Sequence, residues 1–347
     1  MSQAEPILSV RGLTKSFIGR RDMGEKLRRE KSRLIAVDDV SFDLRAHQAI
    51  GVVGESGSGK STVAKCLVRL LEPDSGTITY RSTDVLAARR KDLARIRRSM
   101  QLIYQDPYSS LNPLISVEKA VAEPAEVHGL IPQGQSPRAF AAEMLDLVGL
   151  AASIGSRRPS QLSGGQRQRV AIARAMAIHP EVLIADEPVS ALDVSIQAQV
   201  LNLFEQLRAE QGVAIIMIAH QLGVVAQLAD TLLVMYLGRV VESGPAKQIF
   251  GAPGHPYTAA LLKSQPGRHR RGQRRAPALE GEIPSPMNIP SGCRFRTRCP
   301  IAQEICAQVD PPPVDLGNGQ QAWCHFAGEM TIRESVSQGA TSIGGEG

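Results

Sequence analysis

The glycine-rich stretch GESGSGKS, residues 54–61, constrains the fold of this chain more strongly than any other segment. It has the spacing G-x-x-x-x-G-K-[ST], it follows the apolar run IGVV, and the helical pattern KSTVAKCLVRLL begins near its end. Glycines at these positions let backbone N–H groups turn toward one point, where the N-terminus of the following helix adds partial positive charge. The stretch therefore predicts a strand, a phosphate-binding loop and a helix within an α/β sheet.

The side chains of this loop have separate predicted tasks. Lys60 is expected to reach the β- and γ-phosphates of a nucleotide, and Ser61 is expected to hold Mg²⁺. The predicted nucleotide contacts of the loop are Gly54, Glu55, Ser56, Gly57, Ser58, Gly59, Lys60, Ser61 and Thr62. Alone, the motif indicates only the P-loop class, to which small-molecule kinases, GTPases and motor proteins also belong.

The segment VLIADEP, residues 182–188, is an apolar strand pattern that ends in two carboxylates. Asp186 fits a direct or water-mediated partner of Mg²⁺, and Glu187 fits a general base for a water that attacks the γ-phosphate in line. Two adjacent carboxylates could instead cap the next turn, but a phosphate loop in the same chain favours the catalytic interpretation. Glu187 favours hydrolysis over a kinase reaction, because the sequence gives no signal for a second substrate pocket.

A second glycine step, SGGQ at residues 163–166, precedes the helical pattern RQRVAIARAMAI. The N–H groups and the dipole at such a helix start favour an anion, although Ser163 is also a good ordinary N-cap residue. As an isolated string it does not decide between these two interpretations. Its position just before the acidic strand does, because the order of the motifs then matches a known family.

In this order of motifs the chain resembles the ATPase subunits of ABC transporters. LSGGQ (162–166) matches the family signature without a change, and the other landmarks are Gln105 in YQDP, SALD at 190–193 and His220 after VAIIMIA. The resemblance covers residues 7 to about 262. It implies an α/β P-loop fold of the RecA type, with an antiparallel β subdomain and a helical subdomain at about 86–180 that carries the signature.

The resemblance also implies a head-to-tail dimer. ATP on the phosphate loop of one subunit would be covered by the signature loop of the other, namely Ser163, Gly164, Gly165 and Gln166. Hydrolysis of the γ-phosphate should then loosen the dimer. Asp193 would bridge the interface between the two subunits.

Three further residues receive roles from the resemblance. Phe17 would stack on adenine, Gln105 would sense Mg²⁺ and water, and His220 would contact the γ-phosphate and hold the attacking water together with Glu187. The family often has Asp after this histidine, whereas this chain has Gln221. That departure weakens a local contact without removing a catalytic group.

Four of the five cysteines lie close together near the C-terminus, at Cys293, Cys299, Cys306 and Cys324. Such clustering in a cytosolic chain favours a metal or a cluster over disulfides. The spacing matches neither the paired C-x2-C of zinc ribbons nor the tight ferredoxin run. The interpretations left open are a [4Fe–4S] cluster, Zn²⁺ with His325 as an alternative ligand, and no metal, with buried thiols or a disulfide.

The same segment carries a narrower resemblance. GEIPSPMNIP followed by SGCRFRTRCPIAQEIC and WCHF is similar to the C-terminal extension of oligopeptide/dipeptide importer ATPases, and YQDPYSSLNP (104–113) is similar to their Q-loop. This implies ATP hydrolysis coupled to peptide import, by a peripheral subunit at the cytoplasmic face of the cell membrane. The implied partners are a second, different ATPase subunit, two permeases and an extracytoplasmic solute-binding protein. Close relatives import nickel, glutathione or sugar oligomers.

The expected organisation follows from these motifs. It comprises a nucleotide-binding domain (1–265), a Pro/Arg-rich linker (266–290), a cysteine-rich region (291–326) and a flexible tail (327–347). The charged insertion at 18–35 is interpreted as a solvated loop, with contact to a partner subunit or anionic lipid as the alternative. Residues 104–115 are expected to form part of a groove that receives a cytoplasmic helix of a permease.

Composition limits the other function classes. The N-terminus lacks a basic and apolar leader pattern, and the most apolar region, 212–238, is interrupted by His220, Gln221, Gln227 and Asp230. We therefore expect a soluble, intracellular protein. An ABC ATPase that acts on nucleic acid would predict coiled-coil arms or a basic stripe with interleaved aromatics. The sequence has neither pattern, with aromatics at 4% and a net charge of only +6, so no nucleic-acid partner is expected.

Overall fold

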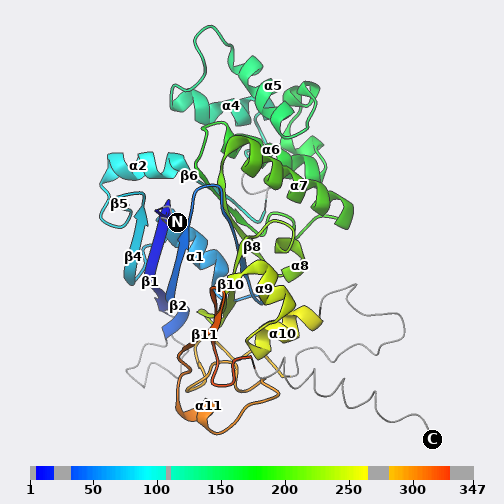
Figure 1. Ribbon diagram of the computed structural model, residues 1–347. Helices are drawn as coiled ribbons and strands as arrows, with labels where there is room; N and C mark the ends of the chain where they lie inside the picture. The colour runs from blue at the N-terminus through cyan, green and yellow to red at the C-terminus, as the bar shows by residue number, and fades with distance from the viewer. Residues whose placement is uncertain (1–4, 19–32, 107–110, 265–280, 329–347) are drawn as a thin grey trace, which may run out of the picture.

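The computed structural model describes residues 5–18, 33–106, 111–264 and 281–328, and Figure 1 shows how their elements are arranged. The largest element is an eight-stranded sheet with the order β11-β12-β10-β9-β3-β8-β7-β6. Along the chain its strands are β3 (Ala49–Val53), β6 (Met100–Ile103), β7 (Val182–Asp186), β8 (Ala214–Ala219), β9 (Thr231–Tyr236), β10 (Arg239–Pro245), β11 (Pro313–Gly317) and β12 (Gln320–Trp323).

Five neighbouring strands of this sheet, β6, β7, β8, β3 and β9, run parallel. Every residue of β3, β7 and β8 is buried, which explains why these segments read as continuous apolar runs. The apolar region between residues 212 and 238 forms β8, the short helix α8 (Leu222–Val225) and β9. The carboxyl ends of the parallel strands meet at one edge of the sheet, and the loops after β3, β6, β7 and β8 gather there.

A second, antiparallel sheet has the order β2-β1-β4-β5. Its strands are β1 (Leu8–Ile18), β2 (Arg33–Leu44), β4 (Ser75–Tyr80) and β5 (Thr83–Asp84). Helix α1 (Lys60–Leu67) follows the phosphate loop, and its Val63, Ala64 and Leu67 belong to one apolar cluster with residues of both sheets. The predicted antiparallel subdomain is therefore present and supports the helix at which the phosphate loop ends.

Helices α4 (Val117–Val127), α5 (Pro137–Leu147) and α6 (Gly164–Met176) pack on one another and rise beyond the end of the sheet in Figure 1. The short 3₁₀ helices η1 (Ala152–Ser156) and η2 (Pro159–Gln161) lie between α5 and α6. The range 86–180, expected to be mainly helical, begins with α2 (Arg90–Ser99) but also contains β6, which pairs with β7. Part of that range therefore belongs to the main sheet.

Helix α7 (Val194–Gln211) buries Val200, Leu203 and Leu207, while Ile196 is only half-buried. After β10 come α9 (Ala246–Gly251) and α10 (Pro256–Lys263). Among the described residues no helix combines the length and the apolar character that crossing a bilayer requires.

The C-terminal segment is attached to the main sheet. After α11 (Ile305–Gln308), β12 pairs antiparallel with β10, and β11 pairs with β12 at the sheet edge. The buried Glu242 of β10 accepts hydrogen bonds from the Gly254 and His255 N–H groups and from Gln320 Nε2, at 2.7, 3.0 and 2.8 Å. This carboxylate joins β10, the start of α10 and β12, an arrangement that the sequence pattern did not predict.

Several expected features fall wholly or partly outside the described residues. They are most of the insertion at 18–35, residues 107–110 of the Q-loop stretch, most of the linker at 266–290 and nearly all of the tail from residue 327.

Candidate active site

The phosphate loop connects the buried strand β3 to helix α1 through glycines that no other residue could replace easily. Gly59 has φ of 100°, a left-handed conformation that strains L side chains, and a Cβ there would overlap the carbonyl oxygen of Ala36. A Cβ at Gly54 would likewise overlap the carbonyl oxygen of Met235. The loop is therefore pressed against β2 and the end of β9, which fixes its shape.

Lys60 is folded back into this loop. Its ammonium donates to the carbonyl oxygens of Gly54 and Glu55, both at 2.8 Å, and to Ser58 Oγ at 3.2 Å. Burial lowers the pKa of Lys60, while the nearby carboxylates of Glu187, Asp186 and Glu55 act in the opposite direction. A buried ammonium that is satisfied mainly by backbone carbonyls can transfer its donors to phosphate oxygens.

Strand β7 delivers the two predicted carboxylates to the same place. Ser61 Oγ donates to Asp186 Oδ1 at 2.8 Å, so the two predicted Mg²⁺ partners are in contact. Burial raises the pKa of Asp186, and the Glu187 carboxylate raises it further, while the hydrogen bond from Ser61 lowers it. Glu187 itself has φ of 48°, a strained conformation for a residue other than glycine. Such strain is concentrated at functional sites.

Two side chains from two other segments, Gln105 and His220, converge on one oxygen of Glu187. Gln105 Nε2, after β6, donates to Glu187 Oε2 at 2.7 Å. His220 Nδ1, directly after β8, lies 3.6 Å from the same oxygen. These side chains lie close together because β6, β7 and β8 are parallel neighbours, so that their carboxyl ends share one edge of the sheet. The three residues predicted to be catalytic are thus in one cluster.

This cluster lies in the wall of a cavity of about 640 Å³ that also contains the phosphate loop. A cavity of this size is typical of small-molecule sites. Phe17 of β1 lines it with 37% of its surface exposed, and the Lys15 ammonium lies 5.6 Å from its ring centroid. The complete lining is Phe17, Leu34, Ala36, Glu55, Ser56, Gly57, Gly59, Lys60, Ser61, Thr62, Gln105, Glu187, His220 and Pro286.

Three of these lining residues were not predicted. Leu34 and Ala36 belong to β2, and Pro286 comes from the segment interpreted as a linker. The Ile35 N–H donates to the Pro286 carbonyl at 3.4 Å, which brings that segment to the cavity. No local pattern could have identified Pro286, because its contacts are with strands more than 200 residues away in sequence.

The second glycine step lies away from this cavity. Ser163 Oγ accepts from the Gln166 N–H at 3.2 Å, and Gln166 Oε1 accepts from the Ser163 N–H at 3.0 Å, so the pair forms a reciprocal cap of α6. A Cβ at Gly165 would lie 2.6 Å from Ile196 Cγ2, which explains a glycine where α6 meets α7. Neither Ser163, Gly164, Gly165, Gln166 nor the exposed Asp193 lines the nucleotide-sized cavity of its own chain.

The four C-terminal cysteines line one small cavity, together with His255, Phe295 and His325. All five cysteines of the chain are free thiols, which argues against the disulfide interpretation. Burial raises the pKa of Cys293, that of Cys299 to about 11 and that of Cys324 to about 12. Within the described ranges, no group of three or more Cys, His, Asp or Glu side chains is placed to hold a single metal ion.

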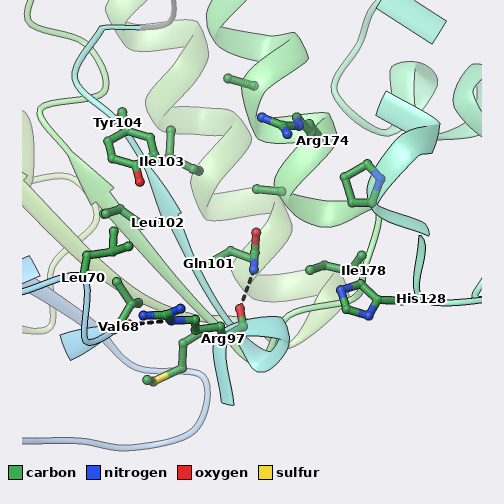
Figure 2. A pocket seen from close by; sticks show the side chains of 14 residues that line it. Val68, Leu70, Arg97, Gln101, Leu102, Ile103, Tyr104, His128, Arg174 and Ile178 are labelled. Carbon is green, nitrogen blue, oxygen red and sulfur yellow. Dashed lines mark hydrogen bonds between the residues drawn. The ribbon is translucent and has the colours of Figure 1, made fainter. Parts of the chain in front are cut away.

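A separate groove of about 410 Å³ runs along the edge strand β6 (Figure 2). Apolar side chains such as Ile103 and Ile178 line it beside Tyr104, which is 41% exposed. Arg97, His128 and Arg174 also lie around it. The Arg97 guanidinium is fixed by hydrogen bonds to the carbonyl oxygens of Val68 and Arg69, at 3.0 and 2.8 Å.

Comparison with known protein families gives two matches. Residues 37–190 match the model of the ABC transporter family, and residues 241–306 match the C-terminal region of oligopeptide/dipeptide transporters. The chain is 41% identical over 325 residues to the oligopeptide transport ATP-binding protein AppF of Bacillus subtilis, covering 93% of this chain and 98% of that protein. It is 42% identical over 323 residues to the di/tripeptide transport ATP-binding protein DppF of Pseudomonas aeruginosa, with the same coverage of 93% and 98%.

Solved structures agree with these matches. The ATP-binding cassette MJ0796, in a dimeric post-hydrolysis state bound to ADP and Pi, superposes with a TM-score of 0.60 at 26% identity, covering 69% of this chain and 98% of that one. CbiO1 from Clostridium perfringens, part of the cbiONQ ABC transporter complex, has a TM-score of 0.60 at 27% identity, with 71% and 91% covered.

Proposed function

Because the chain belongs to the ABC transporter ATP-binding proteins of the oligopeptide/dipeptide importer type, we propose that its hydrolysis of ATP powers the uptake of di- or oligopeptides across the cell membrane. The observation that carries the proposal is the convergence of Gln105 and His220 on Glu187, at the mouth of a phosphate loop.

Glu187 acts as the general base in this proposal. Its Oε2 atom, which accepts a hydrogen bond from Gln105 in this structure, takes the proton of a water placed between the carboxylate and the γ-phosphate. His220, whose Nδ1 atom lies 3.6 Å from that oxygen, orients the water and donates to a γ-phosphate oxygen. Lys60 moves its donors from the loop carbonyls to the β- and γ-phosphates and stabilises the charge that develops on them.

Ser61 at the start of α1 and Asp186 at the end of β7 fit Mg²⁺. Ser61 Oγ and Asp186 Oδ1 are 2.8 Å apart, and both are the hard oxygen donors that Mg²⁺ prefers. Gln105, whose side-chain amide donates a hydrogen bond to Glu187, contributes a further polar group to this part of the site. The ion, when bound with ATP, neutralises phosphate charge during transfer. Phe17, which lines the same cavity, stacks on adenine.

A second ATPase subunit completes the site. Ser163 and the glycines after it form a helix start that can bind an anion, yet they lie outside the cavity of their own chain. In a head-to-tail pair, this helix start covers the γ-phosphate held by the partner's loop, and Asp193 crosses the interface. The neighbouring Val194 is 82% exposed, which suits a surface that becomes buried on pairing.

The groove along β6 receives a cytoplasmic helix of a permease. Apolar side chains such as Ile103 and Ile178 line it together with Arg97, Arg174 and His128, and its β6 segment lies directly before Gln105 in the chain (Figure 2). A helix with an apolar face and an acidic residue suits this lining. Tyr104 lines the groove and the next residue, Gln105, contacts Glu187. A movement of the docked helix is therefore transmitted to the hydrolytic site through a single peptide unit.

In this proposal the four cysteines that line the small cavity would hold a [4Fe–4S] cluster. Four free thiols line one cavity, which matches the four thiolates of such a cluster. A single Zn²⁺ fits less well, since no three side chains are close enough together for one ion, whereas a cuboidal cluster takes its ligands at wider separations. The cluster would supply a covalent link between the turn at Cys293, helix α11 and the end of β12.

The transport assay uses the full chain with its partner ATPase and permeases in proteoliposomes, supplied with binding protein and a labelled peptide. Glu187→Gln is expected to retain ATP binding, trap the paired ATPase subunits and abolish both hydrolysis and peptide uptake. Glu205→Gln, at an exposed position of α7, is the matched control and should transport normally. Uptake by the Glu187→Gln complex at the wild-type rate would contradict the proposal.

A further inference from the structure

The described C-terminal segment, residues 281–328 and here called the extension, contacts the phosphate loop through one ion pair. Arg298 Nη1 and Nη2 donate to Glu55 Oε2 and Oε1 at 2.6 and 3.0 Å, a two-pronged contact with the second residue of the loop. The Arg298 side chain is 4% exposed and that of Glu55 is 23% exposed. A bidentate, nearly buried pair of this kind fixes geometry far better than a surface ion pair does.

The backbone of Glu55 is held by the same cluster of side chains. Its N–H donates to Tyr257 Oη at 2.8 Å. The Tyr257 ring packs against Tyr236 and against Phe295 of the extension, with centroids 4.8 and 5.3 Å apart. The Arg298 guanidinium lies 5.9 Å from the centre of the Tyr236 ring. Both the main chain and the side chain of Glu55 are thus fixed by contacts in which the extension takes part.

The extension reaches the surroundings of the nucleotide cavity at two other points. Pro286 lines the cavity itself, and Arg294 pairs with Asp38 of β2 and donates to the carbonyl oxygen of Leu237. These contacts anchor the extension to β2 and to the turn after β9, so that Arg298 has a fixed position from which to hold Glu55.

The charge of Glu55 explains why this matters for binding. A carboxylate in a phosphate loop repels the phosphates of ATP, and Glu55 also borders the cavity that contains Lys60. Arg298 neutralises that carboxylate and turns it toward the extension. We propose that Arg298 is a positioning residue for the nucleotide: it holds Glu55 away from the phosphates and thereby makes the C-terminal extension part of the ATP-binding site.

This inference rests on the proposed function only in assuming that ATP binds at the phosphate loop. The direct measurement is titration of the full-length chain with a fluorescent ATP analogue, followed by steady-state hydrolysis by the chain paired with its partner ATPase subunit. Arg298→Met is expected to weaken nucleotide binding and raise KM about tenfold, the effect of one uncompensated charge near the phosphates. The turnover number kcat should change little, because Gln105, Glu187 and His220 are untouched.

Rescue separates a charge effect from loss of folding. Adding Glu55→Gln to Arg298→Met removes the exposed charge, so the double variant should recover most of the lost affinity. Arg298→Lys should lose less affinity than Arg298→Met, since it keeps the charge but not the two-pronged contact. Arg296→Met, two residues earlier with a guanidinium that donates to the Ser291 carbonyl, is the matched control and should bind like wild type.

The outcomes are distinct. Wild-type affinity in Arg298→Met, or an equal loss in the presence and absence of Glu55→Gln, would overturn this inference while leaving the ATPase assignment intact. Equal falls in kcat and affinity that the second substitution does not rescue would also overturn it, since they would indicate a purely structural role. Failure of the wild-type chain to bind the analogue would instead refute the proposed function.

Discussion

Acidification is expected to weaken the fold through the buried His255. This residue is 2% exposed, and its Nδ1 atom accepts the Tyr257 N–H at 3.0 Å, which caps the start of α10. Burial lowers the pKa of His255 from 6.5 to about 3. Because the folded-state pKa lies below the unfolded value, the neutral imidazole contributes stability that is complete above pH 6.5 and is lost as the pH falls toward 3.

The size of the effect follows from that difference in pKa. Within this window each pH unit lowers the free energy of unfolding by about 1.4 kcal/mol, so acidification to about pH 5 costs about 2 kcal/mol. The neighbouring Glu242 has its pKa raised by burial, and it therefore changes stability in the opposite direction on acidification. Glu242 is present both in wild type and in a variant at residue 255. Its contribution therefore cancels when the pH dependence of the free energy of unfolding is compared between the two proteins.

The experiment compares wild type with His255→Asn by urea unfolding at about pH 7.5 and pH 5. Asparagine caps a helix N-terminus as histidine does here but does not titrate. Unfolding can be followed by the fluorescence of Trp323, the single tryptophan of the chain, which lies in β12 beside this region. Wild type should lose about 2 kcal/mol more than the variant between the two pH values. Equal losses in both proteins would refute the reasoning, because any packing defect of the variant is present at both pH values.

Three other predictions concern the nucleotide loops and the thiols. Lys60→Ala should weaken binding of the fluorescent ATP analogue by at least tenfold, and unchanged affinity would contradict its predicted role. Gly165→Ala should lower the free energy of unfolding by about 1–3 kcal/mol through its clash with Ile196, and Ile196→Ala in the same chain should reduce that loss, whereas additive losses would exclude the clash. Anaerobic reconstitution with iron and sulfide should give a brown protein whose iron content falls on Cys324→Ser; iron-free wild type would remove the cluster from the proposal.

The chemistry-bearing segments were predictable because each is encoded locally. The loop at 54–61 lies between a buried strand and a helix, so its glycines and Lys60 could be placed without tertiary information. Glu187 and His220 each follow an apolar strand, and parallel strands bring such ends together. The sequence did not reveal the strained φ of Glu187, since that conformation is imposed by surrounding packing.

The contacts of the C-terminal segment were not predictable in the same way. Arg298 and Glu55 are 243 positions apart, and nothing in the string GCRFRTRCP distinguishes the arginine that pairs with the phosphate loop from its neighbours. The pairing of β12 with β10 also joins distant segments. The strands β11 and β12 are too short for an alternation of apolar and polar residues to identify them reliably as strands. Long-range pairing of this kind depends on the whole fold.

The attachment of β12 to β10 has a consequence for biogenesis. On the ribosome, β10 is complete at residue 245, but its partner is made only from residue 320 onward. Until then the nascent ATPase carries an unpaired strand edge, which is a template for association with other chains. A segment made about 75 residues after β10 therefore covers this strand edge, and a product that ends prematurely before β12 leaves the edge open for aggregation or for capture by a chaperone.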